Sequence, residues 1–361
     1  MKKVSLINAY MVFFIIHTAQ IGVGIIGVPR ILFLESKQDA WIVVLFAGII
    51  INLLIWVMFQ ILSRFENKDL YQIHCTVFGE KIGKLFNFVL TIYFIIAYYS
   101  IMNSYIEMAL SWGYEGIYEW VVSFILIFIS VYAVMGGFRV IVGICFLTFL
   151  LTIWLVFVIY QPLDHVQWIR ISPVFNSNLT ELSRGIFRST YTMLGFETLF
   201  FIYPFIKEKN KVHFFAQLAV VFTTCLVCMV TLLSVIYFSP SQLEKTIWPS
   251  LTMLSIVKFP FVERFEYIAI SFWILVILPN LALFLWIATR GLKDVFRIKQ
   301  KYAVWIISVI LWILSFVVTE RVENNTFIDV VALTGFYLWF CYPLFLYIVT
   351  FFKKKERLEK G

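Results

Sequence analysis

The sequence has few charged residues and no long polar stretch. Only 14% of its 361 residues are Asp, Glu, Lys or Arg, whereas 62% are hydrophobic and the mean hydropathy is +0.92. Soluble globular domains carry about 25% charged residues, so this composition excludes that class. No repeat array, low-complexity linker or extended soluble domain separates the hydrophobic runs. We therefore interpret residues 1–361 as a single integral membrane domain.

The sequence also lacks the residue clusters on which enzymes and metalloproteins depend. It has four His and five scattered Cys, and no nucleophile–base pair, metal-ligand cluster or phosphate-binding loop is recognisable. Cys225 and Cys228 lie one turn apart within a hydrophobic run, which favours apolar packing. We therefore predict no enzymatic activity, no metal and no cofactor. The net charge of +8 suits anionic lipid headgroups and requires no nucleic acid.

Hydrophobic runs of about 20 residues predict ten transmembrane helices. They lie near residues 9–33, 40–62, 85–111, 118–135, 138–160, 185–206, 213–238, 265–289, 302–319 and 327–352. Most Lys and Arg fall in alternate loops and at both ends, so the positive-inside rule places both termini on the cytoplasmic side. Lys2 and Lys3 precede the first run, but no small-residue cleavage site follows. We interpret that run as a retained span and not as a signal peptide.

Two of the ten predicted helices contain breaks at matching positions. The first is Gln20–Pro29, with three glycines and a proline, and the second is Thr192–Pro204. Gly195 follows Gly22 by nearly half of the chain. Inside a helix, glycine costs about 1 kcal/mol and proline about 3 kcal/mol. Either break alone is equally consistent with a kink or a close packing face, but a matched pair is typical of a transporter-type binding site.

Several motifs resemble those of one family over nearly the whole chain. They are the Ile21–Pro29 break with Arg30, Gln38-Asp39-Ala40-Trp41, Phe78-Gly79 with Gly83, Gly195-Phe196-Glu197, and Phe261-Val-Glu-Arg-Phe-Glu266 with Trp273. On these motifs the sequence resembles the B subunits of bacterial endospore germinant receptors. These are the GerAB/GerKB-type spore permeases of the amino acid–polyamine–organocation superfamily. The resemblance implies an all-α membrane protein of LeuT/APC-like fold, in which the first and sixth of ten transmembrane helices are broken. It also implies a five-plus-five inverted repeat, over about 9–160 and about 185–352.

The two breaks define the predicted ligand site. Free backbone N–H groups attract a carboxylate and free carbonyls attract an ammonium group, which together suit an α-amino acid. The breaks supply the predicted ligand-binding residues Gly22, Val23, Gly24, Ile25, Leu194, Gly195 and Phe196. By analogy with the family, the third and eighth spans close the pocket with Tyr93, Ala97, Asn280 and Phe284.

Ionisable residues inside the predicted spans are costly and therefore candidates for function. Glu197, which we include among the ligand-binding residues, lies at the second break. It would contact a ligand ammonium group, carry a proton or cap the following half-helix. For Glu107 and Arg188 we favour a structural pair over a proton relay. His17 and Arg30 flank the first break as gate or interface residues, and the sequence leaves this choice open.

The resemblance implies a germinant-sensing subunit of the bacterial spore inner membrane. We expect it to bind a small nutrient, preferably an amino acid, and to signal to A-type and lipoprotein C-type partner subunits. The alternatives are an amino acid permease, coupled to protons or sodium, and an ion channel. Residues 273–286 contain no Ser or Thr, and residues 138–160 contain no Lys. Common coupling-ion devices of this fold are therefore missing, which favours a sensor.

Overall fold

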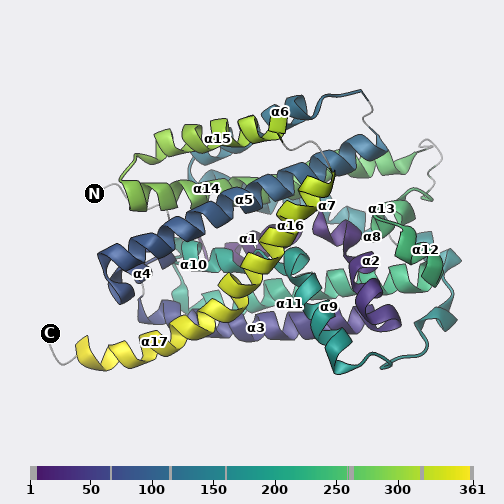
Figure 1. Cartoon of the computed structure of the whole chain (residues 1–361), viewed down its shortest axis with the longest axis horizontal. Coiled ribbons are helices and arrows are strands. Elements are labelled where there is room, and N and C mark those ends of the chain that lie inside the picture. Colours follow the sequence, from purple (N-terminus) through teal and green to yellow (C-terminus); the bar gives the residue numbers. More distant parts are fainter. Residues whose placement is uncertain are drawn as a thin grey trace.

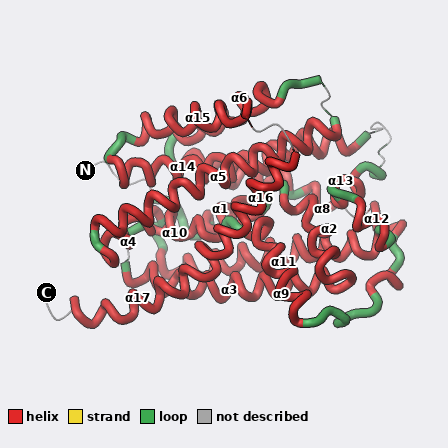
Figure 2. Tube along the Cα trace, in the orientation of Figure 1, coloured by secondary structure: helices red, strands yellow, loops and turns green. Residues whose placement is uncertain are grey.

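The structure is a computed structural model that describes residues 6–65, 67–113, 116–158, 161–257, 259, 264–317 and 321–357. Phe261, Val262 and Glu263 of the Phe261–Glu266 motif lie outside these residues. Every regular element among the described residues is a helix (Figure 2). The long helices run roughly along the longest axis of the molecule, as expected for a bundle that crosses a membrane (Figure 1).

The first half of the chain forms eight α-helices. They are α1 (Met11–Gln20), α2 (Gly24–Ser36), α3 (Ala40–Arg64), α4 (Leu70–Phe78), α5 (Glu80–Trp112), α6 (Glu119–Met135), α7 (Phe138–Thr152) and α8 (Trp154–Val158). Short 3₁₀ helices follow α2 and α8, namely η1 (Lys37–Asp39), η2 (Gln161–His165) and η3 (Trp168–Ile171).

The second half supplies the remaining elements. Its α-helices are α9 (Leu179–Met193), α10 (Leu199–Ile202), α11 (Lys209–Tyr237), α12 (Pro240–Lys245), α13 (Pro249–Leu254), α14 (Phe265–Phe296), α15 (Gln300–Val317), α16 (Arg321–Gly335) and α17 (Tyr342–Arg357). Two 3₁₀ helices flank α10, namely η4 (Phe196–Thr198) and η5 (Tyr203–Phe205), and a π-helix, η6 (Phe336–Cys341), joins α16 to α17.

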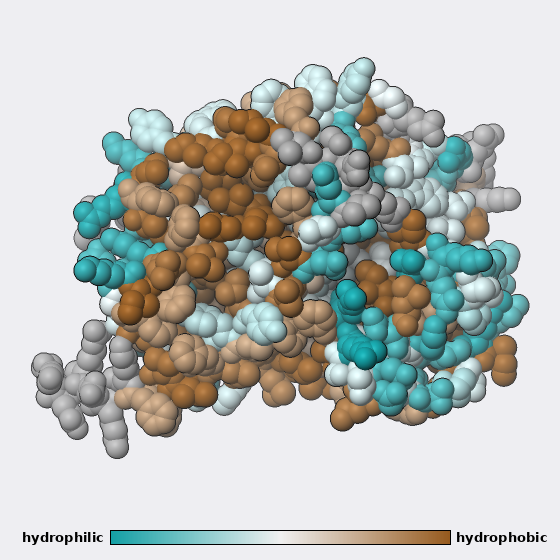
Figure 3. Space-filling view, viewed as in Figure 1, coloured by the Kyte–Doolittle hydropathy of each residue, from teal (hydrophilic) through white to brown (hydrophobic). Residues whose placement is uncertain are grey.

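Six described segments are long and apolar enough to cross a membrane. They are Gly24–Arg64, Glu80–Trp112, Phe138–His165, Lys209–Tyr237, Phe265–Phe296 and Glu323–Phe352. Four shorter apolar helices, Met11–Gln20, Glu119–Met135, Phe196–Phe205 and Gln300–Phe316, coincide with other predicted spans. In Figure 3 a broad hydrophobic area lies between more hydrophilic ends. The chain is therefore an all-helical integral membrane protein, and the count of ten spans stays a prediction.

Local sequence explains where several helices begin. A capping box, in which the N-cap side chain and the N3 side chain each satisfy the other's backbone N–H, starts α4, α9 and α12. The residue pairs are Asp69 with Gln72, Asn178 with Glu181, and Ser239 with Gln242. Asp39 has a related role between elements, because its carboxylate accepts backbone N–H groups of Phe175, Asn176 and Ser177 at 2.8 Å each. It thereby holds the loop before α9 against the start of α3.

The end of the bundle that contains α4 is closed by polar contacts. The Nδ1 of His74 is 2.7 Å from the Oδ1 of Asn87, and its Nε2 is 2.8 Å from the hydroxyl of Tyr342. Burial lowers the pKa of His74 to about 4, so the ring is neutral and can donate to Asn87 while accepting from Tyr342. Asp69 forms an ion pair with Arg290 close by. These contacts hold α4 against α5, α14 and α17.

The segment before α1 pairs with the segment after α10. The backbone N–H of Ile7 donates to Phe205 O at 2.8 Å, and that of Lys207 donates to Ile7 O at 3.0 Å. The N–H of Ala9 donates to Glu208 Oε2 at 2.9 Å. We refer to these contacts as the clasp, because they tie the starting end of α1 to the finishing end of η5.

Candidate ligand-binding site

The first predicted break is present. Helix α1 ends at Gln20, Ile21 is extended, and α2 begins at Gly24. Side chains of α14 satisfy the carbonyl groups that the break leaves free: Asn280 Nδ2 donates to Ile21 O at 2.8 Å, and Trp273 Nε1 donates to Gly22 O at 3.3 Å. The unwound backbone is thus supported by two uncharged donors.

The second predicted break is also present, and it packs against the first. Helix α9 ends at Met193 and Leu194 is extended. Gly195 has φ 122°, and a Cβ atom at this position would lie 2.4 Å from the carbonyl carbon of Ala19. Both its conformation and its closeness to α1 therefore require glycine. Gln20 Nε2 donates to Met193 O at 2.9 Å, which joins the two breaks directly.

Glu197 is used inside the second break itself. Its Oε2 accepts the backbone N–H of Gly195 at 2.6 Å, and its side chain is completely buried. Its Oε1 has no hydrogen-bond partner among the described residues. Of the three roles considered for this carboxyl group, capping the half-helix is the one that this hydrogen bond provides.

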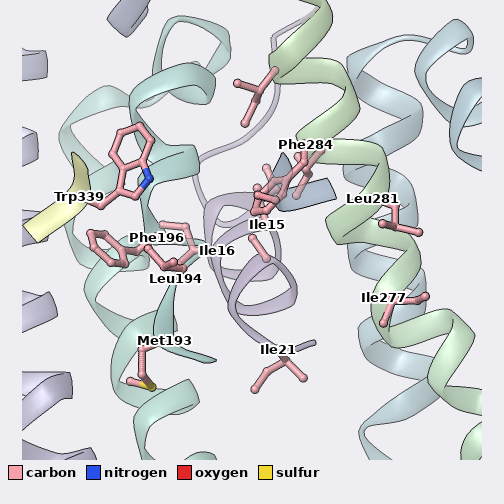
Figure 4. Close-up of a cluster of buried hydrophobic side chains, with 14 of the residues drawn as sticks. Ile15, Ile16, Ile21, Met193, Leu194, Phe196, Ile277, Leu281, Phe284 and Trp339 are labelled. Atoms are coloured by element: carbon pink, nitrogen blue, oxygen red, sulfur yellow. The ribbon is translucent and has the colours of Figure 1, made fainter. Parts of the chain in front are cut away.

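A central cavity of about 30 Å³ lies between the breaks, α5, α14 and α16. Figure 4 shows the buried hydrophobic cluster around the breaks, in which two lining residues are labelled, Phe284 on α14 and Leu194 across α1 from it. Eight predicted residues line the cavity, namely Gly22, Val23, Gly24, Tyr93, Ala97, Leu194, Asn280 and Phe284. Four others are placed near it but do not line it, namely Ile25, Gly195, Phe196 and Glu197.

The structure adds lining residues that sequence reasoning missed, namely Ala19, Gln20, Ile101, Tyr191, Thr192 and Val331. Gln20 and Thr192 could have been predicted to line the cavity, because each is a polar residue at the start of a break. Ile101 and Val331 carried none, since they look like any other apolar residue of a span.

Unpartnered polar atoms distinguish this cavity from ordinary apolar packing. Gln20 Oε1, Asn280 Oδ1 and the Tyr93 hydroxyl have no hydrogen-bond partner among the described residues, and these side chains are only 3%, 1% and 4% exposed. A buried polar atom without a partner costs about 1–3 kcal/mol. None of the described lining residues is charged. The N-terminus of α2 adds backbone N–H groups and the positive end of a helix dipole.

A much larger cavity, the vestibule, adjoins the central one. It has a volume of about 610 Å³ and is lined by parts of α2, α5, α9, α16 and the segment before α13. Both cavities share Val23, Gly24, Tyr191 and Thr192. The Tyr191 hydroxyl is 3.1 Å from Ser100 Oγ on α5, so this ring is fixed at the boundary between the two spaces.

Charged side chains surround the vestibule. Arg188 lies between Glu35 on α2, at 3.5 Å, and Asp329 on α16, at 3.6 Å. The predicted Glu107–Arg188 pair was therefore wrong, and Glu107 instead accepts Asn324 Nδ2 at 2.5 Å. The physical reason is that Arg188 on α9 is directed toward α2 and α16, whereas Glu107 on α5 meets the start of α16.

The two residues that flank the first break have interface contacts. Arg30 also lines the vestibule, and its Nε donates to Glu244 O at 2.7 Å. The Nδ1 of His17 is 2.9 Å from Thr223 Oγ1 on α11.

Comparison with solved structures defines the fold class. The chain is similar to a Na⁺-coupled sialic acid symporter in a substrate-bound outward-open state, with a TM-score of 0.70 and 13% identity over 92% of this chain and 77% of that one. It is also similar to MhsT in complex with L-phenylalanine, with a TM-score of 0.66 and 14% identity over 96% and 88% of the two chains. The protein therefore has a LeuT-like, transporter-type membrane fold.

Sequence comparison then identifies the family. The model of a protein family described as spore germination protein matches residues 6–324 of this chain. The chain is 35% identical to spore germination protein GerQB of Bacillus cereus, over 99% of this chain and 100% of that protein. It is 24% identical to spore germination protein B2 of Bacillus subtilis (strain 168), over 94% of each. The chain belongs to the spore germination protein family, as a B-type subunit of the germinant-receptor kind, and is not an enzyme.

Proposed function

We propose that this chain is the nutrient-sensing subunit of a spore germination receptor and that it binds an amino acid in the central cavity. Ligand binding shifts the conformation of the two broken helices, and A-type and C-type partner subunits receive this change. The protein resides in the spore inner membrane with both termini on the core side. Relatives named as spore germination proteins along its whole length support this assignment.

We infer the class of ligand from the unpartnered hydrogen-bond acceptors that lie beside a helix N-terminus. Gln20 Oε1 and Asn280 Oδ1 are suited to the donors of an ammonium group. The first N–H groups of α2 are suited to a carboxylate. Because none of the described residues that line the cavity is charged, a neutral zwitterion matches it better than an ion of either sign.

The size of the central cavity supports signalling through conformational change. Small-molecule pockets usually measure about 300–1,000 Å³, a range that includes the vestibule at about 610 Å³ but not the central cavity at about 30 Å³. An amino acid therefore has to displace the Tyr191 ring and widen the space between the breaks to reach the unpartnered acceptors. Binding then favours the expanded conformation by the difference in ligand affinity between the two states.

The supported backbone of the first break favours a sensor over a sodium-coupled permease. In transporters of this kind, unwound carbonyls at a helix break coordinate the coupling ion. Here Asn280 and Trp273 already donate to the carbonyls of Ile21 and Gly22. A cation at this position would have to compete with two protein donors.

We also propose that the chain crosses the membrane ten times and that its ten spans form two inverted repeats. Helix α3 packs along α11, and α5 packs along α14. These pairs join the second predicted span to the seventh and the third to the eighth. A twofold relation between the halves would place equivalent helices side by side in this way.

A germinant panel tests the proposed ligand class. Three kinds of spore are compared: spores that lack this gene, and spores of the same deletion strain complemented with the parent gene or with Gly22→Ala. Each is exposed to single amino acids, purine nucleosides and sugars. We expect loss of the response to an amino acid, restored by the parent gene but not by Gly22→Ala at equal protein level. A response lost only for nucleosides or sugars would overturn the amino acid assignment.

Proteoliposomes separate the sensor from a permease. The purified chain is reconstituted, and the radiolabelled amino acid identified by the panel is added with and without sodium or proton gradients. A sensor retains label in proportion to protein and releases it on dilution. Concentrative uptake driven by either gradient would instead show a permease.

A further inference from the structure

A second cavity lies on the other side of the first break and is separate from the ligand site. It measures about 90 Å³ and is lined by parts of α1, α2, α7, α8, α11, α13 and α14. Ile21 and Ile25 of the break face this cavity, whereas Gly22, Val23 and Gly24 face the central one. The break is thus a thin wall between two spaces of different chemistry.

The wall of this second cavity is almost entirely apolar. Apart from His17, its polar side chains are already occupied: Thr152 Oγ1 donates to Thr148 O at 2.7 Å, Ser250 Oγ donates to Ile25 O at 3.3 Å, and Trp273 Nε1 donates to Gly22 O. No charged residue is among the described lining residues. An ionic ligand is therefore excluded by the cost of desolvation.

Among the described lining residues, His17 provides a side-chain nitrogen that no protein group occupies. Its side chain is 6% exposed, and its Nδ1 is bound to Thr223 Oγ1 at 2.9 Å. The other ring nitrogen, Nε2, has no hydrogen-bond partner among the described residues. Aromatic contacts with Phe149, at 5.2 Å, and Phe222, at 5.0 Å, fix the ring. The cavity therefore combines an apolar body with one hydrogen-bonding nitrogen.

We propose that this second cavity binds a small neutral alcohol whose alkyl chain fills the apolar space and whose hydroxyl group bonds to His17 Nε2. An apolar protein cavity of about 150 Å³ holds a benzene molecule, which has six heavy atoms, so a volume of about 90 Å³ suits about three to four heavy atoms, that is, an alcohol of about two to three carbons. A hydroxyl group suits either tautomer of His17, because it both donates and accepts.

Occupation of the cavity has a consequence for the break. A ligand that contacts Ile21 and Ile25 favours the conformation in which this cavity exists, which is the one with the small central cavity. The alcohol should therefore raise the germinant concentration needed for half response. This consequence rests on the proposed sensor function, whereas alcohol binding itself does not.

The binding test uses 1-propanol and the purified full chain in perdeuterated detergent, measured by saturation-transfer NMR. Val230→Phe and Thr152→Leu each add bulk at the cavity wall from different helices. The matched control is Leu53→Phe on α3, where the side chain is 61% exposed on the outer surface. His17→Phe keeps an aromatic ring and removes the nitrogen. Gel filtration tests whether each variant is folded. If Val230→Phe does not fold, the result for Thr152→Leu decides whether filling the cavity abolishes binding.

We expect saturable transfer in the parent and in Leu53→Phe, its loss in both filled variants, and about tenfold weaker binding in His17→Phe. Equal transfer in the parent and in a folded filled variant, or no saturable transfer in the parent, would overturn the site. Unchanged affinity in His17→Phe would overturn the assigned hydrogen bond. If alcohol binds as expected but spores that carry the filled variants keep the alcohol effect on germination, the coupling to sensing fails and the binding site stands.

Discussion

The two helix breaks are built from similar residues but have opposite surroundings. The first break has a cavity on each side, and side chains of α14 support its carbonyl groups. The second break borders the central cavity at Thr192 and Leu194 but is sealed from Gly195 onward, because Gly195 lies against the backbone of α1 and Glu197 caps the half-helix from within. The difference favours our proposal that the first break contributes most to ligand recognition and the second to close packing.

This comparison also separates two uses of buried polar groups. At the first break, Gln20 and Asn280 each satisfy one neighbour with the amide nitrogen and leave the oxygen free. At the second break, one oxygen of Glu197 satisfies its own backbone, and the other has no partner among the described residues but does not line the central cavity. A free polar atom on a side chain that lines the cavity is suited to binding, whereas a carboxylate that caps its own turn away from the cavity is suited to stability.

The largest expected effect is on folding, at the sealed break. Gly195→Ala forces a side chain into a φ of 122° and into contact with the backbone of Ala19. Strained backbone of this kind costs about 1–3 kcal/mol, and the backbone overlap adds to it. We expect almost no folded protein, as measured by membrane abundance and gel filtration. A folded variant with normal abundance would show that the second break is not sealed.

Two glycines of the first break should differ from each other. A Cβ atom at Gly24 would lie 2.7 Å from Thr192 Oγ1, whereas one at Gly22 meets only Asn280 Nδ2, at 3.8 Å. We expect Gly24→Ala to lower the thermal unfolding temperature and Gly22→Ala to leave it almost unchanged. Gly22→Ala should still weaken ligand binding, since a methyl group would occupy much of the cavity. Equal unfolding temperatures for the two variants would contradict this packing.

Asn280 tests recognition at the first break. Asn280→Ala removes the donor to Ile21 O and the free Oδ1, so the half-response concentration should rise about tenfold, which corresponds to about 1.4 kcal/mol. Dose–response curves at equal protein level measure the shift. The control is Asn52→Ala on α3, whose amide donates only to Gly48 O within its own helix. A shift of the same size in Asn52→Ala would mean that the effect is not specific to the cavity.

Glu197 should give the smallest change. Glu197→Gln keeps an acceptor for the Gly195 N–H, so stability and the dose–response curve should remain close to the parent. Glu197→Ala removes the cap and should cost about 1 kcal/mol of stability, seen as a lower unfolding temperature. If Glu197→Gln raised the half-response concentration strongly, or altered its dependence on pH, the carboxyl group would act on the ligand or on a proton.

The positions of the breaks could be predicted from sequence, because glycine and proline act on the backbone locally. Gly22, Gly24 and Gly195 therefore marked both interruptions before any packing was known. Four lining residues of the central cavity, Gly22, Val23, Gly24 and Leu194, followed from them, and four more followed from the family resemblance. The partners of Arg188 could not be predicted, since Glu35 and Asp329 reach it only through the packing of α2, α9 and α16. Tyr191 was missed for the same reason, because its role depends on Ser100 of α5.

The clasp joins the two broken helices at the end of the bundle where the chain begins. Backbone hydrogen bonds through Ile7 tie the starting end of α1 to the residues that close η5, so neither half-helix can tilt alone without breaking them. A displacement of one broken helix is therefore expected to pull on the other through the clasp.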